Sequence, residues 1–420
     1  MAEWLAGYGE EIITPPLGVE LSGYGFYLDR RARSVLDDLK ARAVWLEKDG
    51  SRLLLISCDL VGFSIEHAAS IRRTVGASAG VPAERVLLAC THTHTGPATM
   101  SLPGLGEVDP GYMETLPGSI ARAAARAAAD AQAAEILHSK EILEPIGFNR
   151  RLNSFEGIDP ALGIAYLNRK AGTILVLNYA CHPVILGRST QVSADWPGAS
   201  VRALETEGFK AIVLQGFCGD IDPVTGLNRW GEGSPEDLEL YGRIVAGRAL
   251  KSARYAKVPG EGGLKVAEKK IRIPLSVCPK DKIGEEAEFF LSKNSGFPLA
   301  DRFAEEWKKS AAESHERYAN NPWLEGVPIQ AVNAGGLKII GLPGEIFTLF
   351  GAKLRRGRPT LLTVGYANGD IGYIPGREAF ADAGDYACYC APKFYVGFPF
   401  TSDVEDIVTE AGLAALEAVD

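Results

Sequence analysis

The sequence has no long apolar run and no excess of positive charge. No stretch reaches the roughly 18 consecutive apolar residues that a membrane-spanning helix needs, so we expect no transmembrane segment. The N-terminus shows neither the basic start nor the apolar run of a secretory signal peptide. A formal net charge of −9 over 420 residues argues against a general nucleic-acid binder, which needs a basic surface. These features together predict a cytoplasmic protein.

Cysteine and histidine are both scarce. The seven cysteines are odd in number and widely spaced, and no spacing matches a disulfide framework or a CxxC metal site. We therefore expect free thiols in a reducing compartment. The closest pair, Cys388 and Cys390, would share a face if it lay on a strand. Only six histidines are present, so a metal site built from imidazoles has few possible ligands.

The order of the apolar segments predicts an α/β fold. Asp49-Gly50 between two apolar runs signals a hairpin, and buried strands are expected at 86–90, 173–179 and 211–215. Mixed sheets with helices outside fit this order better than one parallel sheet. With no repeat or linker to divide it, the chain is expected to form a single domain over 1–420. Helices are expected over 64–75, 117–134, 345–354 and 404–418, after Ser234, and within 280–320, a possible helical sub-lobe or lid.

Two histidines, His92 and His94, follow the strand predicted at 86–90. Alternate residues of a strand share a face, so both side chains can point into one site. His182 also follows a buried strand. Imidazole is the commonest zinc ligand, although an isolated pair of this kind fits a core or surface role equally well.

Polar residues follow several other predicted strands, in the segments 219–222, 344–345 and 368–373. The carboxyl ends of strands carry the sites of open α/β sheets, so this pattern predicts a shared cleft. Glu345 has an alternative role as a helix cap. Asp195 is either a partner that orients a ligand histidine or the cap of a helix that contains Pro197.

These motifs, in the order in which they occur along the chain, resemble those of the catalytic domain of neutral (non-lysosomal) ceramidases. The resemblance covers nearly all of that domain. Thr95 stands where the family signature His-Thr-His-Ser-Gly-Pro has serine. The resemblance implies the fold of that domain, with mixed β-sheets packed together and helices on the outside. The similar stretches are 13–16 with 23–25, 91–97, 178–183, 343–345 and 368–386.

The resemblance also implies one zinc ion per chain and the residues around it. His94 would contact the reacting group, Arg150 in the stretch 147–150 would support the site, and Tyr386 would be a second tyrosine, one residue further along than in the family. Arg151 competes with Arg150 for its role. The implied zinc ligands are His92, His182, Glu345 and Tyr373.

The implied reaction is hydrolysis of an amide or related acyl bond by a metal-activated water. The substrate would be a small acylated amine or a lipid-like molecule. Asp222 replaces a family serine, which rules out a serine nucleophile at that position. The signal peptide and the C-terminal β-sandwich domain typical of ceramidases are not found, so the zinc-hydrolase class is better supported than ceramide itself.

Other functions fit the sequence less well. A zinc esterase or deacetylase acting on a small soluble substrate would use the same residues. A metal-free relative would bind a small molecule or a partner protein without catalysis. An amidohydrolase barrel needs further histidines, and a metallo-β-lactamase-like enzyme needs an aspartate where Gly96 stands. The sequence leaves the oligomeric state open.

Overall fold

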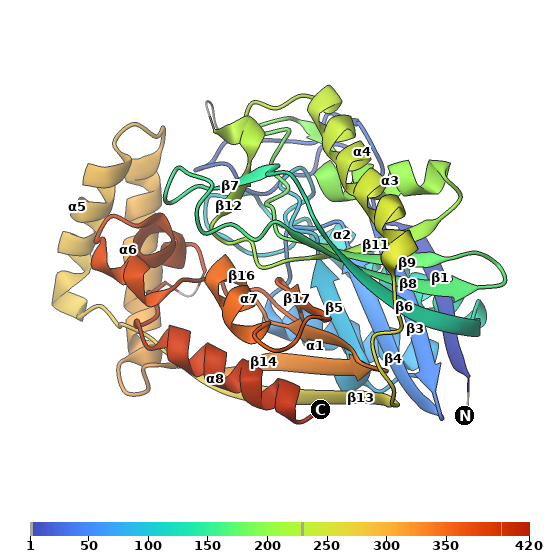
Figure 1. Ribbon diagram of the computed structural model, residues 1–420. Coiled ribbons are helices and arrows are strands. Elements are labelled where there is room, and N and C mark those ends of the chain that lie inside the picture. The colour runs from blue at the N-terminus through green and yellow to red at the C-terminus, as the bar shows by residue number, and fades with distance from the viewer. Residues whose placement is uncertain (1–2, 228–230, 396) are drawn as a thin grey trace.

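The computed structural model describes residues 3–227, 231–395 and 397–420. It confirms the α/β class: an eight-stranded and a four-stranded sheet, both mixed, are packed together and flanked by helices (Figure 1). Among the described helices, none combines the length and apolar character needed to cross a membrane. None of the seven cysteines forms a disulfide.

The larger sheet has the strand order β11-β9-β8-β6-β1-β3-β4-β5. The hairpin predicted at Asp49-Gly50 is confirmed, and the φ angles of +50° and +77° there suit a tight two-residue turn. Only the pairs β4–β5 and β9–β11 are parallel. The strands are β1 (Trp4–Ile12), β3 (Lys40–Lys48), β4 (Ser51–Cys58), β5 (Val86–Cys90), β6 (Gln132–Ile142), β8 (Ala161–Arg169), β9 (Ile174–Tyr179) and β11 (Lys210–Gln215).

The smaller sheet packs on one face of the larger one. Its strands are β13 (Leu264–Pro274), β14 (Trp323–Ala334), β15 (Leu337–Gly341) and β17 (Leu361–Val364), in that order. In β4, successive apolar side chains point to opposite faces of the larger sheet, so one strand contributes to the core on both sides. Leu53 and Leu55 join the core between the sheets, whereas Leu54 and Ile56 face helices on the opposite side.

Helices cover the outer faces of both sheets. The pair α1 (Ile65–Ala79) and α2 (Pro110–Ala129) packs on one part of the larger sheet, and α3 (Asp195–Thr206) with α4 (Pro235–Ser252) covers the part near β9 and β11. The predicted cap at Ser234 is confirmed as a capping box. On the opposite side of the two packed sheets, α7 (Thr348–Leu354) and α8 (Val404–Glu417) cover the smaller sheet (Figure 1).

Two predicted elements were wrong. The helix expected at 117–134 begins earlier, because Asp109 caps it by accepting from the Tyr112 N–H, and the chain beyond Ala131 forms β6 instead. An alanine-rich run carries no period that separates helix from strand. Cys388 and Cys390, for which a strand was only one possibility, lie in a π-helical turn that Asp385 caps.

The second error concerns Glu345, which does not begin or cap a helix. It lies in β16 (Glu345–Ile346), which pairs in parallel with β18 (Tyr373–Ile374), while α7 begins only at Thr348. Asp220 accepts from the Thr348 N–H at 2.8 Å and so provides the cap that Glu345 was expected to give. The pairing sets Glu345 directly beside Tyr373.

The helical character predicted for 280–320 is confirmed. There α5 (Ile283–Asn294) and α6 (Ala300–Tyr318) pack against each other to one side of the sheets (Figure 1). Phe290 and Phe303 lie in the seam, and Phe26 stacks on Phe303 with ring centres 4.8 Å apart. The helix pair therefore shares a core with the rest of the fold. Its motion as a lid stays a prediction.

Candidate active site

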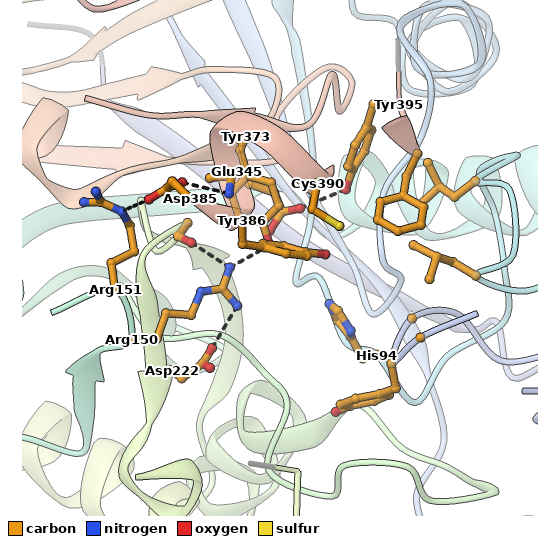
Figure 2. A pocket seen from close by; sticks show the side chains of 18 of the residues that line it. His94, Arg150, Arg151, Asp222, Glu345, Tyr373, Asp385, Tyr386, Cys390 and Tyr395 are labelled. Atoms are coloured by element: carbon orange, nitrogen blue, oxygen red, sulfur yellow. Dashed lines mark hydrogen bonds and ion pairs between the residues drawn. The ribbon is translucent and has the colours of Figure 1, made fainter. Parts of the chain in front are cut away.

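A cavity of about 590 Å³ lies where the strand-end loops meet the α5–α6 pair. Six of the seven predicted site residues line it: His92, His94, Arg150, Glu345, Tyr373 and Tyr386. Figure 2 shows all of these except His92. The seventh, His182, lies against Glu345, with 3.0 Å between its Nε2 and Glu345 Oε2. The shared cleft expected from the strand ends is thus present.

The chain brings His92 and His94 together in a different way from the one predicted. β5 ends at Cys90, and His92 has a φ of +68°, so the two residues do not alternate along a strand. A positive φ is costly for a residue with a side chain and persists where the surroundings enforce it. Here the His92 N–H donates to Leu60 O at 2.9 Å, and the ring stacks on Tyr366. The Nε2 atoms of His92 and His94 still approach to 3.1 Å.

A buried glutamine that the sequence analysis missed joins the two histidine loops. Gln215, at the end of β11, donates through Nε2 to Thr91 O at 3.2 Å and to Cys181 O at 2.8 Å. Thr91 and Cys181 immediately precede His92 and His182. The amide therefore fixes the backbone on which both imidazoles are carried.

Replacing Gln215 with methionine is expected to weaken this link, because the Thr91 carbonyl loses the Gln215 donor and the Cys181 carbonyl keeps only the Trp196 indole N–H. We expect a loss of about 1–3 kcal/mol in the free energy of unfolding, together with weaker metal binding. Gln330→Met is the matched control, since Gln330 is equally buried but donates to Glu84 O, outside the histidine loops. Equal metal affinity in the two variants would show that Gln215 stabilises the fold only.

The hydrogen bonds of His92 and His182 define their tautomers. The Nδ1 of His92 lies 2.6 Å from Val61 O, and the Nδ1 of His182 lies 2.8 Å from Cys218 O. A carbonyl oxygen only accepts, so each Nδ1 carries the proton and each Nε2 of a neutral ring presents a lone pair. Both lone pairs face the centre of the cluster.

Glu345 places a carboxylate opposite these lone pairs. Its Oε2 lies 3.0 Å from His182 Nε2 and 3.5 Å from His92 Nε2. Burial alone would raise the pKa of Glu345, but the two histidines hold it well below its usual range. Burial likewise lowers the pKa of His182, whereas Glu345 outweighs burial at His92 and raises its pKa. Acceptors facing one another in this way need a proton or a cation between them.

The donor set suits a divalent metal ion. Ligand atoms of His92, His94 and His182 all lie within 4.8 Å of one another, and Glu345 adds a carboxylate oxygen. Imidazole nitrogen with carboxylate oxygen is a combination that zinc binds in catalytic sites. The residues present therefore fit a metal ion.

His94 stands between the cluster and the cavity. Its ring packs edge-on against Tyr24, with ring centres 5.2 Å apart. Gly23 has a φ of +86°, and a Cβ there would lie only 2.4 Å from His94 Nδ1, so only glycine lets the chain pass so close. Burial lowers the pKa of His94 well below its usual value, and the other two histidines add to this effect. His94 is consequently neutral.

Arg150 reaches the site from a short pair of strands. β7 (Gly147–Asn149) pairs with β12 (Ile221–Pro223), and Arg150 follows β7 directly. Its guanidinium donates to Tyr373 Oη at 2.6 Å and lies 3.2 Å from Asp222 Oδ1 (Figure 2). Arg151 instead donates to Asp385 at 2.6 Å. Of the two candidate arginines, Arg150 faces the cluster.

Three tyrosines surround Glu345 and Arg150. Burial raises the pKa of Tyr373 well above its usual value, an effect that Arg150 opposes and Glu345 reinforces. The Tyr386 ring packs edge-on against Tyr373 and is half exposed, with ring centres 5.6 Å apart. Tyr395 was missed by the sequence analysis, yet its hydroxyl donates to Glu345 Oε1 at 2.8 Å. Nothing in its local sequence sets it apart from a packed aromatic residue.

The role suggested for Asp195 as the partner of a ligand histidine was wrong. Its carboxylate accepts from the N–H groups of Trp196 and Leu186, at 2.8 and 3.3 Å, and stabilises the turn that begins α3. The Nδ1 partners of His92 and His182 are backbone carbonyls instead. These carbonyls fix the ring orientation that a carboxylate was expected to fix.

Comparison with known proteins identifies solved structures that share this fold. No family model matches the sequence. No curated protein matches it either. Among solved structures, neutral ceramidase from Pseudomonas aeruginosa superposes with a TM-score of 0.73 at 19% identity, covering 100% of this chain and 74% of that one. A structure described as ceramidase complexed with C2 gives a TM-score of 0.75 at 18% identity, covering 100% and 75% respectively.

The superpositions extend over the whole chain, including both sheets and the segments that form the cavity. At this level of identity, structural similarity establishes the fold and leaves the reaction to be argued from the site. The mixed sheets and outer helices predicted from the sequence are the same architecture. The chain adopts the neutral ceramidase fold.

Proposed function

We propose that this protein is a zinc-dependent hydrolase that cleaves an amide or a related acyl bond. The observation that carries the proposal is the convergence of the His92 and His182 lone pairs on the Glu345 carboxylate, beside a cavity large enough for a small molecule. The ceramidase fold supports the same class of reaction.

One zinc ion per chain would be held by His92, His182, Glu345 and Tyr373. The first three already direct acceptor atoms at one point, and the β16–β18 pairing holds Tyr373 beside Glu345. A zinc ion bound there would supply a nucleophilic water at neutral pH, by lowering the pKa of that water to about 7. His92 and His182 have the tautomer that this binding requires.

The remaining residues would act on the substrate. His94 is neutral, borders the cavity and would exchange a proton with the reacting group through Nε2. Tyr386 is half exposed and would donate to the oxygen on which negative charge develops. Arg150 would hold the Tyr373 hydroxyl in place and offset the charge of Glu345.

The cavity walls suggest an acylated amine with an apolar part. The side facing α5 and α6 is apolar and is formed by Phe26, Leu102, Leu105, Phe297 and Phe394. Both structural neighbours are described as ceramidases, so ceramide is one candidate, and shorter acylated amines are others. Asp222 forms an ion pair with Arg150 within the cavity lining. This ion pair places charged groups at the polar end of the cavity, where they would help to select the amine part of the substrate.

We further propose that the chain works as one domain in a reducing compartment such as the cytoplasm. The cavity beside the histidines draws its lining from segments between residues 22 and 395, which favours one folding unit. The seven cysteines, none in a disulfide, are compatible with reducing conditions.

The proposed activity is testable with the purified protein and a panel of acyl compounds. We expect hydrolysis of at least one acylated amine, loss of that activity after dialysis against a chelator, and recovery on addition of zinc. The panel should include long-chain ceramide, N-acetyl and N-hexanoyl amines, and the matching esters. Turnover of esters alone would replace the amidase assignment with a zinc esterase. No turnover of any compound by zinc-loaded protein would contradict a hydrolytic function.

A further inference from the structure

We propose that Tyr395 is a positioning residue that selects which oxygen of Glu345 faces the metal-binding histidines. The inference rests on the proposed zinc site and goes beyond it, because Tyr395 lies outside the proposed ligands and the proposed catalytic residues. It concerns the orientation of Glu345 and gives Tyr395 no part in the reaction itself.

The geometry divides the two oxygens of Glu345 between different partners. Oε1 accepts the Tyr395 hydroxyl at 2.8 Å (Figure 2). Oε2 lies 3.0 Å from His182 Nε2. A carboxylate oxygen only accepts, so the Tyr395 hydroxyl is the donor. The bond occupies Oε1 and keeps the carboxylate from turning about its terminal torsion, which is otherwise broad.

The surrounding backbone fixes Tyr395 and Glu345 relative to each other. The Gly372 carbonyl accepts from the Glu345 N–H at 2.9 Å. Gly372 also has a φ of +90°, and a Cβ there would lie 2.8 Å from Tyr395 Cδ2. One glycine therefore binds the Glu345 backbone and leaves room for the Tyr395 ring. This arrangement explains how two residues 50 positions apart keep a defined hydrogen bond.

Tyr373 also hydrogen-bonds to Glu345, but its hydroxyl is shared with Arg150. The Tyr373 hydroxyl accepts from Arg150 at 2.6 Å, and the Tyr386 ring is half exposed at the cavity. Tyr395 approaches Glu345 on its Oε1 side, away from the 3.0 Å contact of Oε2 with His182. Partners of this kind typically change metal affinity by about 10- to 100-fold when they are removed.

The test is Tyr395→Phe in the full chain, which keeps the ring and removes only the hydroxyl. We expect its zinc dissociation constant, measured by competition with a chromophoric chelator, to rise about 10- to 100-fold. The melting temperature measured without zinc should change little, and at saturating zinc the effect on kcat should exceed the effect on KM. Tyr389→Phe is the matched control, since the Tyr389 hydroxyl donates to Glu286 O at 3.1 Å, away from the cluster.

The outcomes separate this inference from the proposed function. If wild type and Tyr395→Phe bind zinc with equal affinity, the positioning role is overturned while the zinc site stands. If Tyr389→Phe loses as much affinity as Tyr395→Phe, the effect is not specific to the Glu345 contact and the role is again overturned. If the wild type binds no zinc, the proposed function itself fails.

Discussion

Replacing His182 with alanine is expected to reduce hydrolysis to the background rate and to abolish stabilisation by zinc. His182 Nε2 lies 3.0 Å from Glu345 Oε2, and its Nδ1 is committed to a backbone carbonyl. The variant therefore loses one of the converging acceptors and leaves Glu345 with fewer partners. Zinc at about 100 times its dissociation constant should stabilise the wild type by about 2.7 kcal/mol. Thermal unfolding with and without zinc measures this difference.

A second histidine variant controls for the loss of any imidazole. His67 is exposed on α1, and no described side-chain bond of its ring reaches the cluster. His67→Ala should keep wild-type hydrolysis and the full response of the melting temperature to zinc. Retention of both properties by His182→Ala would remove His182 from the metal site. Loss of both by His67→Ala would mean that the assay does not report on the cluster.

His94→Ala is expected to keep the metal and lose most of its turnover. The Nε2 of His94 lies 3.1 Å from that of His92, but its ring also borders the cavity and packs on Tyr24. Removing a group that transfers a proton typically costs about 100- to 10,000-fold in rate. We expect a loss of this size in kcat, with zinc content unchanged. Steady-state kinetics and elemental analysis of the same preparation measure both quantities.

The variant His94→Gln tests whether His94 transfers a proton or only fills space beside the cavity. Glutamine fills much of the same space and can hydrogen-bond, but it does not exchange a proton near neutral pH. It should therefore be as inactive as alanine. Full activity of His94→Ala would contradict the role given to His94. Loss of zinc from both variants would make His94 a metal ligand, together with His92 and His182.

The fold was predictable where the sequence carries a clear period or turn signal. The strand at Val86–Cys90 has the predicted limits, and the Asp49-Gly50 hairpin follows from its turn residues. The prediction failed over 117–134, because the alanine-rich sequence runs from the end of α2 into β6 and does not mark where the helix ends. It failed at Glu345 because a two-residue strand depends on its partner Tyr373, which is distant along the chain.

The candidate site was predictable in its residue types and only partly in its geometry. His92, His182 and Glu345 converge as the order of motifs suggested. The sequence did not show that His92 lies in a left-handed turn after the strand has ended. Gln215 and Tyr395 were missed because each acts through hydrogen bonds to residues that are far away in the sequence. Glutamine at a strand end and tyrosine in an aromatic stretch carry no local signal of such a role.

Metal content of the purified protein tests the central claim most directly. The wild type, supplied with zinc and then dialysed, should contain about one zinc per chain by elemental analysis, and His182→Ala prepared in the same way should contain almost none. The converging acceptor atoms of His92, His182 and Glu345, together with the chemistry of zinc, predict this result. A folded wild type that contains no zinc after this treatment would contradict the account and favour a metal-free binding protein.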